Sequence, residues 1–122
     1  MSFRLPVAVL LAATLAAPAS AAITTGAFVT RARALQGEGP AALLDPDFQT
    51  LRGEAQAATA QLKADRAARE AAGKKPIACI PEGQSLGIAE MIDGLDALSP
   101  AEKKLPLKDG YAHVLAKRFP CR

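Results

Sequence analysis

The chain has 122 residues, with 15 lysines and arginines against 12 aspartates and glutamates, and its formal charge is +3. This mildly basic balance gives no indication of nucleic-acid binding, which normally needs a clustered basic face. The length suffices for one domain with a modest core. One histidine and two cysteines do not make a zinc site, so we expect neither a metal nor a cofactor.

The first residues have the layout of a secretory signal peptide. Arg4 precedes an apolar run that is too short to span a membrane, and Ala19-Ser20-Ala21 supplies the small residues that signal peptidase requires. No cysteine follows the run, so lipid attachment is not expected. We therefore predict a signal peptide over residues 1–21 and one periplasmic or secreted domain over residues 22–122, without membrane insertion after cleavage. An uncleaved anchor is the alternative.

The mature chain is predicted to begin with a short helix in TTGAFVTRARALQGEG, residues 24–39. Thr25 is the expected N-terminal cap, and Gly37 and Gly39 are the expected stop. The expected inner face has residues at helical spacing, namely Phe28, Ala32 and Leu35. A short piece, PAALL, follows this helix.

A long helix is predicted from Pro46 to Ala72. Asp45 can cap it, and Gly73 is a good stop signal. Its expected core face steps by three and four residues through Phe48, Leu51, Ala55, Ala58 and Leu62. A straight helix of this length would measure about 40 Å, so it must bend, with Gly53 as a candidate position, or its end must project. After Leu62 only alanines are apolar, so the second half is either solvated, as we expect, or packed closely against another backbone.

The remaining chain predicts three further helical segments. Ser85 is the expected cap of a helix whose core stripe comprises Ile88, Met91, Ile92 and Leu95. Ser99 to Glu102 fits a capping box, and a last helix covers about Leu107 to Arg118, with an inner face of Leu107, Tyr111, Val114 and Leu115. This part is richer in large apolar residues and predicts the denser core. No alternating stretch is long enough for a sheet, so the predicted fold is an all-α small helical domain.

The two cysteines lie at positions that a helix hairpin would bring together. Cys79 precedes the third helix and Cys121 follows the last one. In an oxidising compartment two thiols tend to pair, and a bond here would close a loop of about 43 residues, with a stabilisation of about 4 kcal/mol. We predict one intramolecular disulfide that closes the C-terminal helix hairpin. Free thiols or an intermolecular bond are the alternatives.

Residues 79–121 also resemble the C-terminal half of the Rap/Tai family of type VI secretion immunity proteins. The shared marks are Cys79-Ile80-Pro81, Leu105-Pro106 and Phe119-Pro120-Cys121. The resemblance implies an exported helical protein that commonly forms dimers and that binds and blocks peptidoglycan-cutting amidases. The family's N-terminal helices usually carry a further cysteine and a Gly-rich pattern, whereas this chain has an Ala-rich charged helix there.

No residue pattern predicts a catalytic site, and we expect a protein that is not an enzyme. His113 is expected to be a half-exposed surface residue, and a Cys79–His113 dyad would require free thiols. Asp93 and Asp96 could share a helix face, but two carboxylates alone are a weak acid–base or metal signal. The Gly-Glu-Gly at residues 37–39 is interpreted as a helix stop and not as a phosphate loop.

Two classes of function remain. The first is an envelope protein that binds another protein, such as an immunity protein that inhibits a secreted amidase effector. The second is a structural or chaperone-like periplasmic protein that uses the long helix as its contact surface. In both cases a protein partner is expected, a homodimer is possible, and the predicted contact residues on the long helix are Gln56, Lys63, Arg66 and Arg69.

Overall fold

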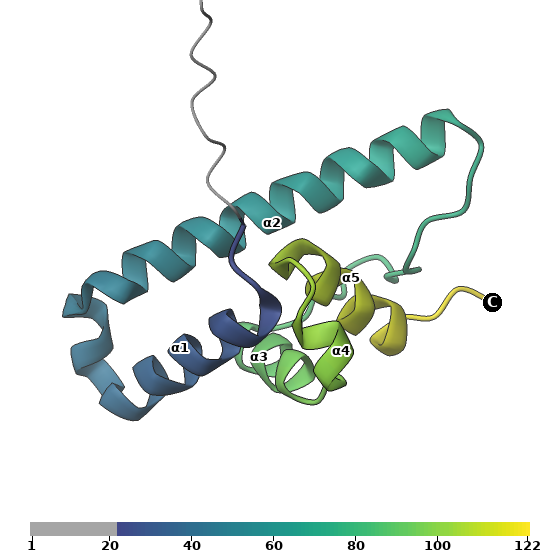
Figure 1. Cartoon of the computed structure of the whole chain (residues 1–122). Coiled ribbons are helices and arrows are strands. Elements are labelled where there is room, and N and C mark those ends of the chain that lie inside the picture. Colours follow the sequence, from purple (N-terminus) through teal and green to yellow (C-terminus); the bar gives the residue numbers. More distant parts are fainter. Residues whose placement is uncertain (1–21) are drawn as a thin grey trace, which may run out of the picture.

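A computed structural model describes residues 22–122, so the predicted signal peptide lies outside the described residues. The elements are α1 (Thr25–Glu38), the 3-10 helix η1 (Gly39–Leu44), α2 (Pro46–Ala71), α3 (Ile88–Asp96), α4 (Pro100–Lys103) and α5 (Leu107–Arg118). The prediction of an all-α fold is confirmed, with no strand in the described part of the chain. Figure 1 shows α2 lying across the other helices. Within the same residues no helix is both long and apolar enough to cross a bilayer.

The start of α1 is tied to the chain that precedes α5. Thr24, and not Thr25 as predicted, is the N-terminal cap, because its Oγ1 accepts a hydrogen bond from the Ala27 amide at 3.2 Å. Thr25 is fully buried instead, and both its amide, at 2.9 Å, and its Oγ1, at 3.0 Å, donate to the carbonyl of Leu105. The helix runs through Gly37 and ends before Gly39, whose φ of 59° is the left-handed conformation that glycine favours.

The hydrophobic core draws on both halves of the chain. Leu95 and Leu107 are the largest apolar side chains that are fully buried. The other buried apolar residues are Phe28, Val29, Ala32, Leu35, Leu51, Ala58, Ile92, Leu98, Val114 and Phe119. Six of these twelve residues lie within residues 22–76 and six within the shorter stretch 77–119. The C-terminal part therefore has the higher density of buried apolar residues, as predicted, although Ala32 and Ala58 add buried positions to α1 and α2 that a count of large side chains omits.

Two glycines allow α5 to approach its neighbours closely. A Cβ atom built on Gly110 would lie 2.7 Å from Cγ2 of Thr25, and one built on Gly94 would lie 2.7 Å from Cγ1 of Val114. Real Cβ atoms do not come this near to another carbon. These positions therefore set how tightly α5 packs on α1 and α3.

The long helix α2 begins at Pro46 as predicted and ends at Ala71, one residue before the predicted end. The Asp45 side chain accepts a hydrogen bond from the Asp47 amide, and Gly73 follows the last turn with a φ of 70°. The helix continues through Gly53, and its C-terminal turns extend past α5 (Figure 1). No residue of α2 after Leu62 is buried, in agreement with the expected solvated second half.

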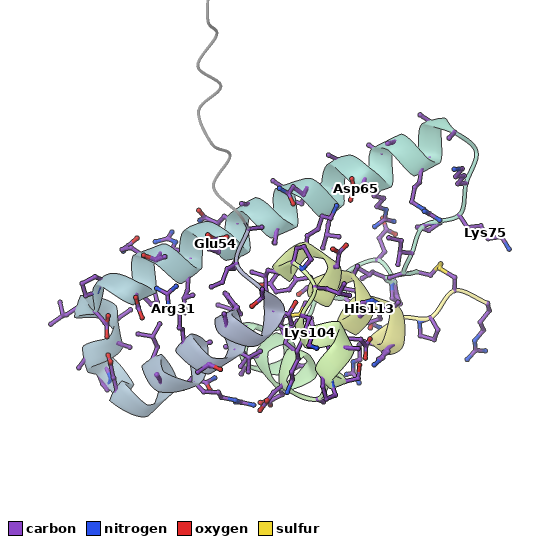
Figure 2. The ribbon with its side chains drawn as sticks, viewed as in Figure 1. Arg31, Glu54, Asp65, Lys75, Lys104 and His113 are labelled. Atoms are coloured by element: carbon purple, nitrogen blue, oxygen red, sulfur yellow. A yellow bond between two sulfur atoms is a disulfide. The ribbon has the colours of Figure 1, made fainter. Side chains whose placement is uncertain are left out.

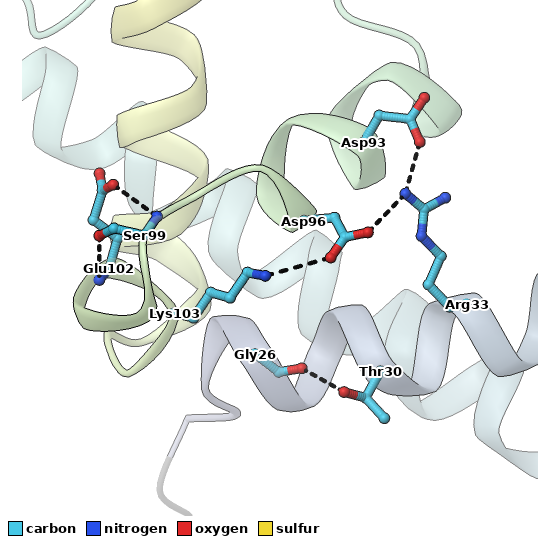
Figure 3. Close-up of polar contacts among 8 residues, drawn as sticks. All are labelled: Gly26, Thr30, Arg33, Asp93, Asp96, Ser99, Glu102 and Lys103. Atoms are coloured by element: carbon cyan, nitrogen blue, oxygen red, sulfur yellow. Dashed lines mark hydrogen bonds and ion pairs between the residues drawn. The ribbon is translucent and has the colours of Figure 1, made fainter.

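The C-terminal elements agree with their predicted bounds except at the start of α3. Gly87, not Ser85, is the cap of α3, so the helix begins two residues later than that cap would require. Ile92 and Leu95 face the core as predicted and Met91 is half-buried, but Ile88 is 83% exposed, because it lies in the first turn beyond the reach of the core. The capping box is confirmed: Ser99 and Glu102 exchange side-chain and backbone hydrogen bonds at 3.1 and 3.2 Å (Figure 3).

The predicted disulfide is confirmed. Cys79 and Cys121 are bonded, with their Cα atoms 4.9 Å apart. The Cys79 amide also donates to the Phe119 carbonyl at 2.8 Å. The segment that joins α2 to α3, residues 72–87, is therefore fastened at its middle to the end of α5; we call it the connecting segment.

Candidate functional site

A large groove runs along α2 between this helix and the rest of the molecule. Its volume is about 1340 Å³, and its walls come from α1, α2, α3, α5 and the connecting segment. The floor is apolar, with Phe28, Leu51 and Ile92 among its residues. The ring of Tyr111 stands edge-on to Phe28 with centroids 6.3 Å apart, and burial raises the pKa of its phenol.

One face of α2 supplies the long wall of the groove. The lining residues on this face recur at helical spacing: Phe48, Leu51, Ala55, Thr59, Leu62, Arg66 and Arg69. From Phe48 to Arg69 this face measures about 32 Å at 1.5 Å per residue. Its first half is apolar and continuous with the core, and its second half carries the charged ends of long side chains. The groove is therefore an elongated channel with a gradient from apolar to polar.

The connecting segment forms the opposite wall at the C-terminal end of α2. Ile77, 46% exposed, lines the groove from this segment, and Ile88 lines it from the first turn of α3. The wall is held in place from both sides, because the disulfide fastens it to α5 and the Arg69 Nε donates to the Lys75 carbonyl at 2.9 Å. In Figure 2 this segment descends from the end of α2 past Lys75.

The rim of the groove is positively charged. Arg52, Lys63 and Arg66 line it from α2, and none of them forms an ion pair within residues 22–122. The single acidic residue of the lining is Asp65, on the side of α2 nearest α5 (Figure 2), where the Nζ of Lys108 neutralises it at 3.1 Å. The net charge that the rim presents to an occupant is therefore positive.

All four predicted contact residues on the long helix lie along this groove. Gln56, Lys63 and Arg66 are exposed, and Arg69 is partly buried through its bond to the connecting segment. The structure thus brings together the residues that the sequence could only place on one helix. That they contact a partner stays a prediction.

The polar residues considered for catalysis have structural partners instead. His113 Nδ1 lies 3.2 Å from Oε2 of Glu102, and the histidine side chain is 45% exposed, as expected for a surface residue. A dyad with Cys79 is excluded by the disulfide. Within the described residues no group of histidines, cysteines and carboxylates could hold a metal ion.

Asp93 and Asp96 share a face of α3, as predicted, and both face α1. The Nη2 of Arg33 lies 2.8 Å from Asp93 and 3.1 Å from Asp96, and Lys103 approaches Asp96 at 3.4 Å (Figure 3). The hydrogen bond from Arg33 lowers the pKa of Asp96, with a smaller contribution from Lys103. The two carboxylates therefore join helices and are not an acid–base pair.

Sequence reasoning missed the wall opposite α2. Ile88 was placed in the core stripe of its helix, and Ile77 and Leu86 were not considered as site residues, although both line the groove. One signal could have found them. Residues 76–88 contain four large apolar side chains but also two prolines and two glycines, which is more apolar surface than a segment without regular structure can bury.

The sequence matches no protein-family model, and neither a curated protein nor a solved structure matches it. Any proposal about function must therefore rest on the shape, charge and chemistry of the groove.

Proposed function

We propose that this protein works in the cell envelope by binding another protein in the groove along α2, and that it does not turn over a substrate. The observation that carries the proposal is the groove itself: it is large, apolar along its floor and bordered by unpaired cations. Exposed apolar surface bordered by polar residues is typical of protein-interaction sites. A binding role is also supported by the cysteines and the histidine, which are engaged in structural contacts.

The specific form that we propose is an inhibitor similar to a type VI secretion immunity protein. The resemblance of residues 79–121 to that family supports this form, and so does the place of those residues in the molecule. They contain Ile80, Leu86 and Ile88 of the groove wall and both cysteines that fasten it. A partner of this class is a peptidoglycan-cutting amidase.

Site-specific photo-crosslinking tests the proposal. A benzophenone amino acid replaces Gln56, which lines the groove, or Gln61, which is exposed on α2 but does not line it. The two variants remove the same residue type from the same helix. On irradiation of intact cells, the Gln56 variant is expected to capture one envelope protein and the Gln61 variant none.

Three other results would change the conclusion. Equal capture at both positions would show that the groove is not the contact surface. Capture of many unrelated proteins at Gln56 would favour the chaperone-like alternative. Hydrolysis of peptidoglycan fragments by the purified protein would contradict the binding role itself.

Export is part of the proposal and has its own test. The protein recovered from the periplasm or the medium is expected to begin at Ala22, which intact-mass spectrometry would detect. A recovered chain that still begins at Met1 would support the uncleaved-anchor alternative.

A further inference from the structure

We propose that the segment bound in the groove is an amphipathic α-helix of the partner, apolar along one face and acidic at the end that lies beside Lys63 and Arg66. This inference rests on the proposed function and specifies the chemistry of the partner at the same site. Three independent features of the groove lead to it: its size, the lack of strand edges in its walls, and the position of its charges.

The size of the groove favours a polypeptide over a small molecule. Pockets for drug-sized ligands and cofactors usually measure about 300–1000 Å³, whereas this groove measures about 1340 Å³. It also extends along about 32 Å of α2, which equals the length of a helix of about 21 residues. An occupant that fills it must therefore be long and must present apolar surface along the apolar part of the groove.

The walls determine the conformation of such a segment. Burial of backbone amides and carbonyls without hydrogen-bond partners costs free energy. The helices, which form most of the wall, have their own backbone groups paired, and the described residues include no strand whose edge could accept an added strand. The connecting segment has no regular structure. A segment bound along the helices must therefore satisfy its own backbone, as a helix does. This is the helix-in-groove mode of recognition, in which apolar residues at positions i, i+3, i+4 and i+7 of the bound helix contact the groove.

The charges indicate which end of the bound helix is acidic. Lys63 and Arg66 are three residues apart on the polar half of the α2 face, and neither has an acidic partner in the described chain. Arg69 lies one turn further and is held over the groove by its bond to the Lys75 carbonyl. Near Phe48 and Leu51 the wall is apolar and carries one cation, Arg52. Acidic side chains at one end of the partner helix, and apolar ones along the rest, match this distribution.

Synthetic peptides of 20 residues test the inference on the full mature chain. The first carries leucines at i, i+3, i+4 and i+7 with four glutamates at one end, and the second replaces those glutamates by lysines. A third has the composition of the first but alternates apolar and polar residues as a strand does. Binding is measured by fluorescence anisotropy at low and high salt. We expect the acidic helix to bind at least about tenfold more tightly than the other two, with an advantage over the lysine peptide that shrinks at high salt.

A charge-reversed protein supplies the decisive comparison. Lys63→Glu with Arg66→Glu is expected to reverse the preference, so that the lysine peptide binds more tightly. The matched control, Lys104→Glu with Arg122→Glu, changes the net charge equally at exposed residues outside the groove and should keep the wild-type preference. If the groove variant does not fold, the wild-type ratio between the first two peptides still decides the question.

Each remaining outcome has a definite meaning. Equal binding of all three peptides would overturn the inference. The inference would also fail if palmitate displaced the acidic helix at a lower concentration than unlabelled peptide does, because the groove would then favour a lipid chain. If the acidic helix fails while Gln56 still crosslinks to an envelope protein, the partner uses another kind of segment and the proposed function stands. If nothing crosslinks at Gln56, the proposed function fails as well.

Discussion

Two regions of this molecule, both of which contain helices, differ sharply in how tightly they are packed. Where α1, α3 and α5 meet, Thr25, Leu95 and Leu107 are at most 2% exposed, and glycines bring the helix backbones close together. Along the second half of α2, no residue after Leu62 is buried, and the other side of the groove is a segment without regular structure. Both regions contain helices, but only in the first do buried contacts between side chains determine how the helices lie.

The difference separates stability from recognition. Most of the stability of a small domain comes from buried apolar contacts, and these lie in the packed region. The second half of α2 and the connecting segment keep apolar and cationic side chains at a surface, where they add little to folding. Substitutions should therefore act on folding in one region and on binding in the other, and the predictions that follow test this division.

The largest effect is expected from the disulfide, which joins the two regions. Replacing both Cys79 and Cys121 by serine removes the bond between two residues that are 42 positions apart. The loss of this bond should lower the free energy of unfolding by about 4 kcal/mol. At roughly 4–8 °C per kcal/mol, the melting temperature should fall by well over 10 °C, measured by circular dichroism. Reduction of the wild type is the control and should give the same fall. A change of only a few degrees would mean that the bond does not constrain the unfolded chain.

The next effect concerns the closest contact in the packed region. Gly110→Ala places a methyl group against the buried Thr25, and overpacking of this kind costs about 1–3 kcal/mol. In a chain that already carries Thr25→Ala, the two nearest clashing atoms, Oγ1 and Cγ2, are gone, so Gly110→Ala should cost less there. Chemical denaturation of the four proteins of this cycle measures the coupling. Strictly additive costs would contradict the contact.

The sequence predicted those parts of the fold that depend on local chemistry. The caps Asp45 and Ser99, the stop at Gly73 and the disulfide follow from residue types at fixed spacing, and each is confirmed. The burial of Thr25 was missed, because it depends on contact with residues 80 positions away. Ser85 was predicted to cap α3 for its residue type alone, but the chain enters that helix two residues later, at Gly87.

A glycine-to-alanine substitution at an exposed position of α2 should have the opposite effect to Gly110→Ala. Gly53 lies in the first half of α2, and a Cβ atom there would meet no atom within 4 Å outside its own stretch of helix. Gly53→Ala is therefore expected to stabilise the protein by about 0.5–1 kcal/mol, through the lower helix propensity of glycine. Its melting temperature should rise by a few degrees while that of Gly110→Ala falls. A destabilised Gly53→Ala would show that α2 has a neighbour at this position.

A smaller effect is expected on acidification. Hydrogen bonds from Arg31 lower the pKa of Asp47, those from Arg33 lower that of Asp96, and the Ser99 amide lowers that of Glu102. A carboxyl whose pKa is lower in the folded state stabilises the fold fully above its unfolded pKa, about 4, and this stability is lost as the pH falls through the folded value. Glu38 acts in the opposite sense, because its contact with Asp45 raises its pKa.

Because three carboxyl groups have a lowered pKa and only one has a raised pKa, the melting temperature should fall modestly between pH 5 and pH 3. Arg33→Gln removes the stronger of the two partners of Asp96 and should make this fall smaller. Scanning calorimetry at three pH values measures both proteins. A melting temperature that rises on acidification would mean that the ion pairs between helices do not contribute in solution.

The candidate site was predictable only in part. The face of α2 could be read from its periodicity, which is why Lys63 and Arg66 were selected correctly as exposed residues. The opposite wall could not be predicted, because Ile77 and Ile88 form one surface only when the disulfide fixes the connecting segment beside α2. The periodicity of a sequence shows which residues share a face of one helix, whereas a groove depends on how several elements lie relative to one another.

The smallest effect on stability is expected at the rim of the groove, and it is the sharpest test of the division between the two regions. Lys63→Glu with Arg66→Glu should leave the melting curve nearly unchanged, because exposed substitutions away from the core usually alter stability by no more than about 0.5 kcal/mol. Arg69 is left intact in this variant, since its Nε holds the Lys75 carbonyl and its loss would disturb the wall. The matched control is again Lys104→Glu with Arg122→Glu. If the groove variant melts several degrees lower than this control, Lys63 and Arg66 support the fold itself, and the second half of α2 is part of the stabilising region.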